Sequence, residues 1–465
     1  MPHDRRALRQ DKADFAQVRH EQRKRDRKDM KANRLIFTFL LASSVAVLQL
    51  AGQQTKADQR RIEEVKAKAE AGDAESQVEL GLRYEQGKGV AKDQVEAVKW
   101  YRKAAEQNYA EAQNSVGVCY EKGEGVTKNQ AEALKWFRKA AEQNYAKAQY
   151  NLAHCFDTGE GVAKDPVEAA KWLHKAAEQN LAAAQYNLGV CYDKGAGVAI
   201  DHTEAAKWYR NAAEQNFAEA QYNLGTRYAR GEGVAEDQVE AMKWYRKAAE
   251  QNLAAAQNNL GLRYEQGKGV AKDQMEAVKW YRKAAEQNFA EAQFNLAVCY
   301  AHGEGVAKDP VEAVKWYRKA AEQNFAKAQY NLGLCYGHGK GVAEDQVEAV
   351  KWYRKAAEQN YAAAQNNLSV CYEQGKGVAK DPVEKAKWLR QAAEQNYATA
   401  QYNLGICFYN GNGVAKDWVE AYKWWLLAAK QGDEDAKENM TVLESKLTPE
   451  QIAEGKTRAR DFKPR

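Results

Sequence analysis

Proline and serine are nearly absent from the middle of this 465-residue chain. Residues 74–433 contain three prolines, Pro166, Pro310 and Pro382. They also contain three serines, none of which begins an S-x-x-K motif: Ser76, Ser115 and Ser369. The chain lacks a phosphate-binding P-loop and an H-E-x-x-H zinc-protease sequence. Because no catalytic motif is recognisable, the sequence predicts a protein that is not an enzyme.

Net charge is absent from most of the chain. Residues 1–34 carry twelve Lys or Arg against six Asp or Glu, a surplus of six that equals the +6 of the whole chain. All remaining residues together are therefore formally neutral. Since a nucleic-acid-binding domain shows a basic patch, we expect no nucleic-acid partner.

Ten tryptophans recur every 36 residues with no insertion or deletion between them: Trp100, Trp136, Trp172, Trp208, Trp244, Trp280, Trp316, Trp352, Trp388 and Trp424. A fixed period of this length indicates a stacked array of repeats. The ten copies cover residues 74–433. Repeat positions are numbered from the first residue of each copy, so that Ala290 stands at position 1.

Each copy predicts two helices. In the copy from Ala290 to Phe325, apolar residues at i, i+4 and i+8 indicate a first helix: Ala292, Leu296 and Tyr300. Gly303 and Gly305 then end that helix, because glycine accepts positive φ without steric cost.

The second helix of this copy is marked at both ends. Asp309 and Glu312 form a D-x-x-E capping signal, with Pro310 at the first helical position. The helix runs to about Glu322, and Asn324 closes it in the left-handed conformation. One side of this helix is apolar: Ala313, Val314, Trp316, Tyr317, Ala320 and Ala321. A single pair cannot bury this side alone, so the copies must stack into an all-α solenoid.

The segments outside the array have different compositions. Leu35 to Ala51 carries no charge, and its seventeen residues span about 26 Å as a helix, against ~30 Å for a hydrocarbon core. We expect a short signal anchor; the alternatives are the apolar region of a cleaved signal peptide and a segment of a soluble protein. Thr448 and Gln451 predict a capping box near the C-terminus. The predicted organisation is a basic tail (1–34), a transmembrane signal anchor or signal-peptide region (35–52), a linker and N-capping helix (53–73), ten repeats (74–433), and C-capping helices with a basic end (434–465).

The repeat resembles the Sel-one-like repeat (SLR), a 36-residue relative of the tetratricopeptide repeat. The resemblance lies in the pattern A-x-A-x-x-x-L-G-x-x-Y-x-x-G-x-G-V-x-x-D-x-x-x-A-x-x-W-Y-x-x-A-A, seen from Ala218 to Ala249 and, with small variations, in the other copies. It implies a right-handed α/α superhelix of helix-turn-helix repeats that acts as a scaffold or adaptor for other proteins. A penicillin-hydrolysing activity has been proposed for some SLR proteins, and no motif in this chain supports it.

All cysteines occupy position 10, on the first helix: Cys119, Cys155, Cys191, Cys299, Cys335, Cys371 and Cys407. Equivalent helices of adjacent repeats lie roughly 8–10 Å apart, beyond the ~7 Å limit between Cα atoms of a disulfide. The disulfides that join the two helices of each repeat in some SLR proteins need a second cysteine, which this chain lacks. We expect buried thiols. The alternative is a reactive thiol where one cysteine borders the groove.

Histidine does not predict a metal site. His302 and His338 share a position in adjacent repeats, but they are then roughly 8–10 Å apart, whereas one zinc ion needs ~2 Å bonds from both. His154 precedes Cys155, yet successive helical residues point about 100° apart. The sequence therefore predicts neither a metal nor a cofactor.

A polar and aromatic row on the first helices is the candidate binding site. Position 6 is asparagine in eight repeats: Asn151, Asn187, Asn223, Asn259, Asn295, Asn331, Asn367 and Asn403. Position 5 is mostly aromatic: Tyr150, Tyr186, Tyr222, Phe294, Tyr330 and Tyr402. In related repeat proteins the first helices line a concave surface, where amides suit a peptide backbone and rings supply anchors. The alternative is that each asparagine caps or braces its own repeat, or only reflects duplication.

The function predicted from these features is a non-enzymatic scaffold of a bacterium that binds a protein or extended peptide in a concave groove. The chain would be a single-pass membrane protein held through residues 35–51. The positive-inside rule places residues 1–34 in the cytoplasm and the repeats outside it, in the periplasm or beyond. Cleavage would instead give a secreted protein. Two other functions stay open, a hydrolase of a cell-wall or β-lactam-like substrate and a structural spacer.

Overall fold

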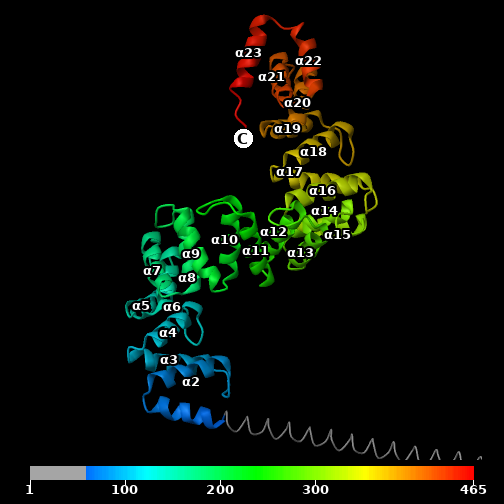
Figure 1. Cartoon of the computed structure of the whole chain (residues 1–465). Helices are drawn as coiled ribbons and strands as arrows, with labels where there is room; N and C mark the ends of the chain where they lie inside the picture. The colour runs from blue at the N-terminus through cyan, green and yellow to red at the C-terminus, as the bar shows by residue number, and fades with distance from the viewer. Residues whose placement is uncertain (1–58, 465) are drawn as a thin grey trace, which may run out of the picture. The chain divides into compact units, whose positions relative to one another are not determined.

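The computed structural model describes residues 59–464, and all their regular elements are helices (Figure 1). The predicted basic tail and the apolar segment 35–51 lie outside these residues. None of the helices between residues 59 and 464 is long and apolar enough to cross a membrane. The chain divides after Gln179 into two compact units.

The first unit contains the helical residues 59–70, followed by three helix pairs. Each helix packs on the next one along the chain, both within a repeat and between repeats. The pairs are α2 (Ala74–Gln86) with α3 (Gln94–Glu106), α4 (Ala110–Lys122) with α5 (Gln130–Glu142), and α6 (Ala146–Thr158) with α7 (Pro166–Glu178).

The second unit repeats the same arrangement in seven further pairs and ends in two more helices. Its pairs are α8 (Ala182–Lys194) with α9 (His202–Glu214), α10 (Ala218–Arg230) with α11 (Gln238–Glu250), α12 (Ala254–Gln266) with α13 (Gln274–Glu286), α14 (Ala290–His302) with α15 (Pro310–Glu322), α16 (Ala326–His338) with α17 (Gln346–Glu358), α18 (Ala362–Gln374) with α19 (Pro382–Glu394), and α20 (Ala398–Asn410) with α21 (Trp418–Lys430). The last two are α22 (Glu434–Glu444) and α23 (Pro449–Arg460). The three pairs of the first unit and the seven pairs of the second confirm the predicted α-solenoid.

The helix ends lie where the sequence places them. Helix α14 ends before Gly303, whose φ is 80°, and Asn324 adopts φ 65° after α15. The Oδ1 atom of Asp309 accepts the backbone N–H of Glu312 at 3.0 Å, which satisfies one of the free donors at the start of α15. The Glu312 carboxylate itself pairs with Lys315 at 2.7 Å.

The core lies between the two helices of each pair and between neighbouring pairs. All six residues predicted on the apolar side of α15 are buried. Trp316 is buried at the edge of this core, and Nζ of Lys319 lies 4.0 Å from the centre of its ring. At the same position Trp244 is only half-buried, and Nζ of Lys247 lies 4.1 Å from its ring centre. The tryptophans therefore join the core to the charged face, where a cation can stack on them.

The C-terminal helices cover the last repeat. Helix α23 packs against α21, and the Tyr422 ring lies where a side chain at Gly455 would otherwise be. Thr448 and Gln451 form the predicted capping box, with both reciprocal hydrogen bonds present. The Phe462 ring meets Trp424 edge-on at 5.4 Å. These contacts close the apolar end of the second unit.

Candidate functional site

The predicted row lies on the first helices, and each of its asparagine and aromatic residues is half-buried. In five repeats the side-chain amide of position 6 donates a hydrogen bond to position 5 of the preceding repeat. Nδ2 of Asn151 donates to Oδ1 of Asn114, and Nδ2 of Asn295 donates to Oδ1 of Asn258, both at 2.9 Å. Longer bonds of 3.3, 3.5 and 3.4 Å follow the same rule: Asn259 to Tyr222, Asn367 to Tyr330, and Asn403 to Asn366.

One amide departs from this pairing. Nδ2 of Asn331 donates to the backbone carbonyl of Lys327, one turn earlier on its own helix, at 2.9 Å. The other asparagines named above brace the preceding repeat rather than their own, which differs from the bracing considered from the sequence. An asparagine amide has two donor hydrogens and an acceptor oxygen, so a single bond leaves capacity for a partner.

The aromatic residues of position 5 are fixed by ring contacts. The Tyr186 ring lies 5.9 Å from that of Tyr209 on the second helix and 5.2 Å from that of Phe217 at the end of the repeat. Phe294 makes the equivalent contacts in its own repeat. Burial raises the pKa of the Tyr186 and Tyr222 hydroxyls above the ordinary value of tyrosine. Each ring is thus packed against neighbouring rings and remains partly exposed. A fixed, partly exposed ring suits an apolar contact with a partner.

Pockets open between consecutive repeats beside this row. A pocket of about 180 Å³ is lined by Tyr222, Asn259 and Arg263, among others. A larger one of about 630 Å³ has Asn367 and Tyr353 in its wall and lies further along the same unit. Residues of the row therefore line pockets between repeats.

A second amide network was missed by sequence reasoning. Position 4 is a buried glutamine in all ten repeats: Gln77, Gln113, Gln149, Gln185, Gln221, Gln257, Gln293, Gln329, Gln365 and Gln401. Nε2 of Gln257 donates to the carbonyl of Ala249 and to Oδ1 of Asn252, both at 3.1 Å. Its Oε1 accepts from Nε2 of Gln287 at 2.7 Å. The signal was present in the sequence, since a polar residue that recurs at one position of every copy, beside apolar Ala and Leu, indicates a buried structural role.

The cysteines lie on the core side of the first helices as free thiols, five of them buried and two, Cys191 and Cys335, half-buried. Burial, with a smaller contribution from nearby glutamates, raises the pKa of the Cys299 thiol to about 12. A thiol needs to ionise before it can attack or bind a metal. The expected buried thiols are confirmed for these five residues. His302 and His338 are exposed.

The fold and this site define a class of protein, the α-solenoid built from stacked helix pairs with an amide-lined row on its first helices. The Sel1 repeat family model matches ten consecutive segments: 74–109, 110–145, 146–181, 182–217, 218–253, 254–289, 290–325, 326–361, 362–397 and 398–433. The chain belongs to the Sel1 repeat family, as the resemblance predicted. Proteins of this family are generally interaction scaffolds rather than enzymes.

Two solved structures share this fold. A protective antigen of uropathogenic Escherichia coli with an SLR fold is 36% identical, with a TM-score of 0.58 over 86% of this chain and 94% of that one. A Sel1 repeat protein of Oxalobacter formigenes is 32% identical, with a TM-score of 0.54 over 66% of this chain and 89% of that one. Among curated proteins, the secretory immunoglobulin A-binding protein EsiB of Escherichia coli is 49% identical over 43 residues, which span 9% of each chain.

Proposed function

We propose that this protein is a non-enzymatic scaffold that binds an extended segment of another protein along the asparagine and aromatic row. The observation that carries the proposal is the repetition of the row at one register, with half-buried amides and packed rings beside inter-repeat pockets. A peptide backbone repeats its own donors and acceptors, so a periodic row of amides complements it. EsiB, to which part of the chain is similar, binds a protein according to its name.

The first test compares two asparagines of the row that make different hydrogen bonds within the protein. Asn295 braces the preceding repeat, whereas Asn331 bonds to its own helix. If the row binds peptide, Asn295→Ala and Asn331→Ala should each weaken the complex by roughly 0.5–1.5 kcal/mol. The triple change of Asn223, Asn259 and Asn295 to alanine should then cost several times as much. A partner recovered by crosslinking pull-down, titrated against each variant, gives the measurement.

The same two variants also distinguish a role of the asparagines in peptide binding from a purely structural role. Asn331→Ala removes a bond within one helix rather than between repeats, so its free energy of unfolding should stay close to that of the unchanged protein. If the row were only structural, Asn331→Ala would bind as the unchanged protein does, while Asn295→Ala would lose stability. That pattern would refute a peptide-binding row.

We further propose that residues 35–51 hold the protein in a membrane with the repeats outside the cytoplasm. This rests on the uncharged segment that follows a basic tail. The protein should remain with membranes after a high-salt wash, and protease added to spheroplasts should digest the repeats while sparing residues 1–34. Repeats protected together with the tail would reverse the orientation. A soluble product starting near Val47 or Gln53 would show cleavage instead.

A further inference from the structure

In four repeats an acidic side chain at position 12 has a hydrogen-bond donor in the surrounding structure. The carboxylate of Glu85 accepts the hydroxyl of Tyr101 at 2.6 Å. Glu265 accepts the hydroxyl of Tyr281 at the same distance. Both tyrosines stand at position 28 of the same repeat as the acid, on the second helix. This hydroxyl satisfies the partly buried carboxylate without any added cation.

For two of these acids the donor is a cation: Lys385 pairs with Glu373 inside one repeat, and Arg227 joins two carboxylates at a junction between repeats. Arg227 stands at position 10, between Asp193 at position 12 of the preceding repeat and Glu232 at position 15 of its own. Its Nη1 lies 2.6 Å from Oε2 of Glu232, and its Nη2 pairs with Asp193. His202 adds a contact to Asp193 at 3.0 Å. Two carboxylates at these positions therefore face one small space, and a positive charge fills it.

The junction of the second and third repeats has the two carboxylates without the donor. Glu121 stands at position 12 and Glu160 at position 15. Position 28 is Phe137, which has no hydroxyl, and position 10 is the uncharged Cys155. Neither side chain supplies a positive charge or a hydroxyl donor to the two carboxylates.

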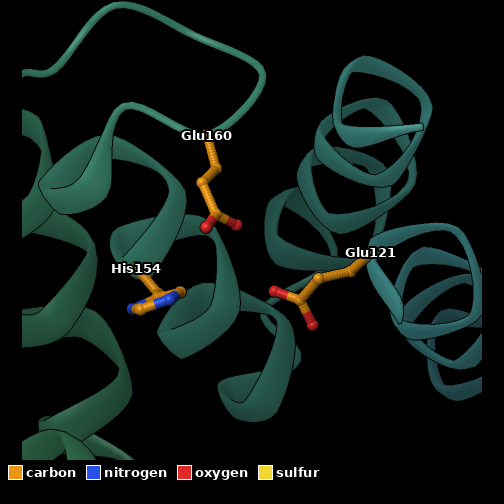
Figure 2. Close-up of side chains that lie close together, drawn as sticks. All are labelled: Glu121, His154 and Glu160. Atoms are coloured by element: carbon orange, nitrogen blue, oxygen red, sulfur yellow. The ribbon is translucent and has the colours of Figure 1, made fainter. Parts of the chain in front are cut away.

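A histidine completes the group. His154 stands at position 9 of the third repeat, where no other repeat has a histidine. One ligand atom from each of His154, Glu121 and Glu160 lies within 4.8 Å of the other two. Figure 2 shows the two carboxylates directed toward one another, with the imidazole beside them. Glu121 and Glu160 are half-buried and His154 is exposed, so an ion could enter from solvent.

We propose that His154, Glu121 and Glu160 form a zinc site. One imidazole and two carboxylates are ordinary zinc ligands, and three protein ligands leave a fourth tetrahedral position for water. The imidazole favours zinc over magnesium or calcium, which prefer oxygen alone. Tetrahedral bonds of ~2.1 Å place ligand atoms roughly 3.4 Å apart. The ligand atoms must therefore approach one another by up to about 1.4 Å, which the exposed His154 and the long Glu121 permit.

The ion would connect two repeats. Glu121 lies on α4, whereas His154 lies on α6 and Glu160 follows α6 in the turn. Glu160 is already held by Nε2 of Gln130 at 3.0 Å, which orients its carboxylate toward the site. Metal ligands are usually held by hydrogen bonds of this kind from residues that do not themselves bind the metal. Zinc would replace, at this junction, the positive charge that Arg227 supplies at another.

Calorimetric titration of the full-length, EDTA-treated protein with zinc chloride tests the site. We expect one zinc ion per chain and a higher melting temperature with zinc than with magnesium. His154→Ala and Glu121→Gln should each weaken zinc binding at least tenfold, because each removes a direct ligand. Both side chains are accessible to solvent, and circular dichroism checks that each variant remains folded.

Two control variants test whether zinc binds at this junction rather than at another histidine or acid of the array. His302→Ala removes an exposed histidine on α14, and Glu265→Gln alters an acid of the same repeat position whose carboxylate already bonds to Tyr281. Both should bind zinc as the unchanged protein does. The absence of saturable zinc binding would overturn the proposal. Equal binding by the unchanged protein, His154→Ala and Glu121→Gln would also overturn it, because the zinc would then be held elsewhere.

Discussion

Replacing Gly269 by alanine should destabilise the second unit by more than about 3 kcal/mol. Gly269 has φ 74°, a conformation that side chains disfavour, and an added Cβ would lie 2.0 Å from the backbone oxygen of Gln238. That oxygen belongs to the first turn of α11, which Asp237 holds by accepting two backbone N–H groups. Neither backbone can retreat without separating two repeats. Chemical denaturation followed by circular dichroism measures the loss.

The control is the neighbouring glycine of the same turn. Gly267 has φ 68°, but an added Cβ would come no closer than 3.4 Å to its nearest neighbour, the Cβ of Lys272. Gly267→Ala should therefore cost only the conformational strain, about 1–2 kcal/mol. Hydrogen exchange should increase around α10 to α12 for Gly269→Ala and much less for Gly267→Ala. Equal losses from both changes would show that the turn adapts and that the close approach is not essential.

The fold could be predicted because every copy carries the same local signals. Glycine at two fixed positions of each copy, an aspartate before the second helix (asparagine in the second copy) and an asparagine after it (glycine in the tenth copy) define where each helix begins and ends. The period then fixes the number of pairs. These signals act within one copy, through backbone conformation and capping, so a single sequence displays them ten times.

Contacts between copies were harder to predict, since the period does not give the register in which one repeat stacks on the next. Asn295 was placed correctly on the first helix, but its bond to Asn258 depends on that register. The group of Glu121, His154 and Glu160 was missed for the same reason. Its members occupy three different repeat positions in two copies, so neither a shared repeat position nor a neighbouring cysteine brings them together in the sequence.

The buried glutamine of position 4 is where an inter-repeat contact should matter most for stability. Gln257 is 2% exposed, and its amide group meets three partners at the junction. Gln257→Leu keeps a similar volume but removes three hydrogen bonds, the two that its amide donates to Ala249 and Asn252 and the one that it accepts from Gln287. Each lost hydrogen bond costs about 0.5–1.5 kcal/mol. We expect a total loss of roughly 2–4 kcal/mol in the free energy of unfolding.

Two companion variants assign that loss to hydrogen bonding. Gln266→Leu, at an exposed position of the same helix α12, should change stability by no more than about 0.5 kcal/mol. Gln257→Glu has nearly the shape of glutamine and still accepts from Gln287, but an ionised carboxylate cannot donate to Ala249 or Asn252. It should therefore destabilise the protein at neutral pH although the packing is unchanged. If Gln257→Leu were as stable as the unchanged protein while Gln257→Glu was not, the burial of charge would matter at this junction and the amide bonds would not.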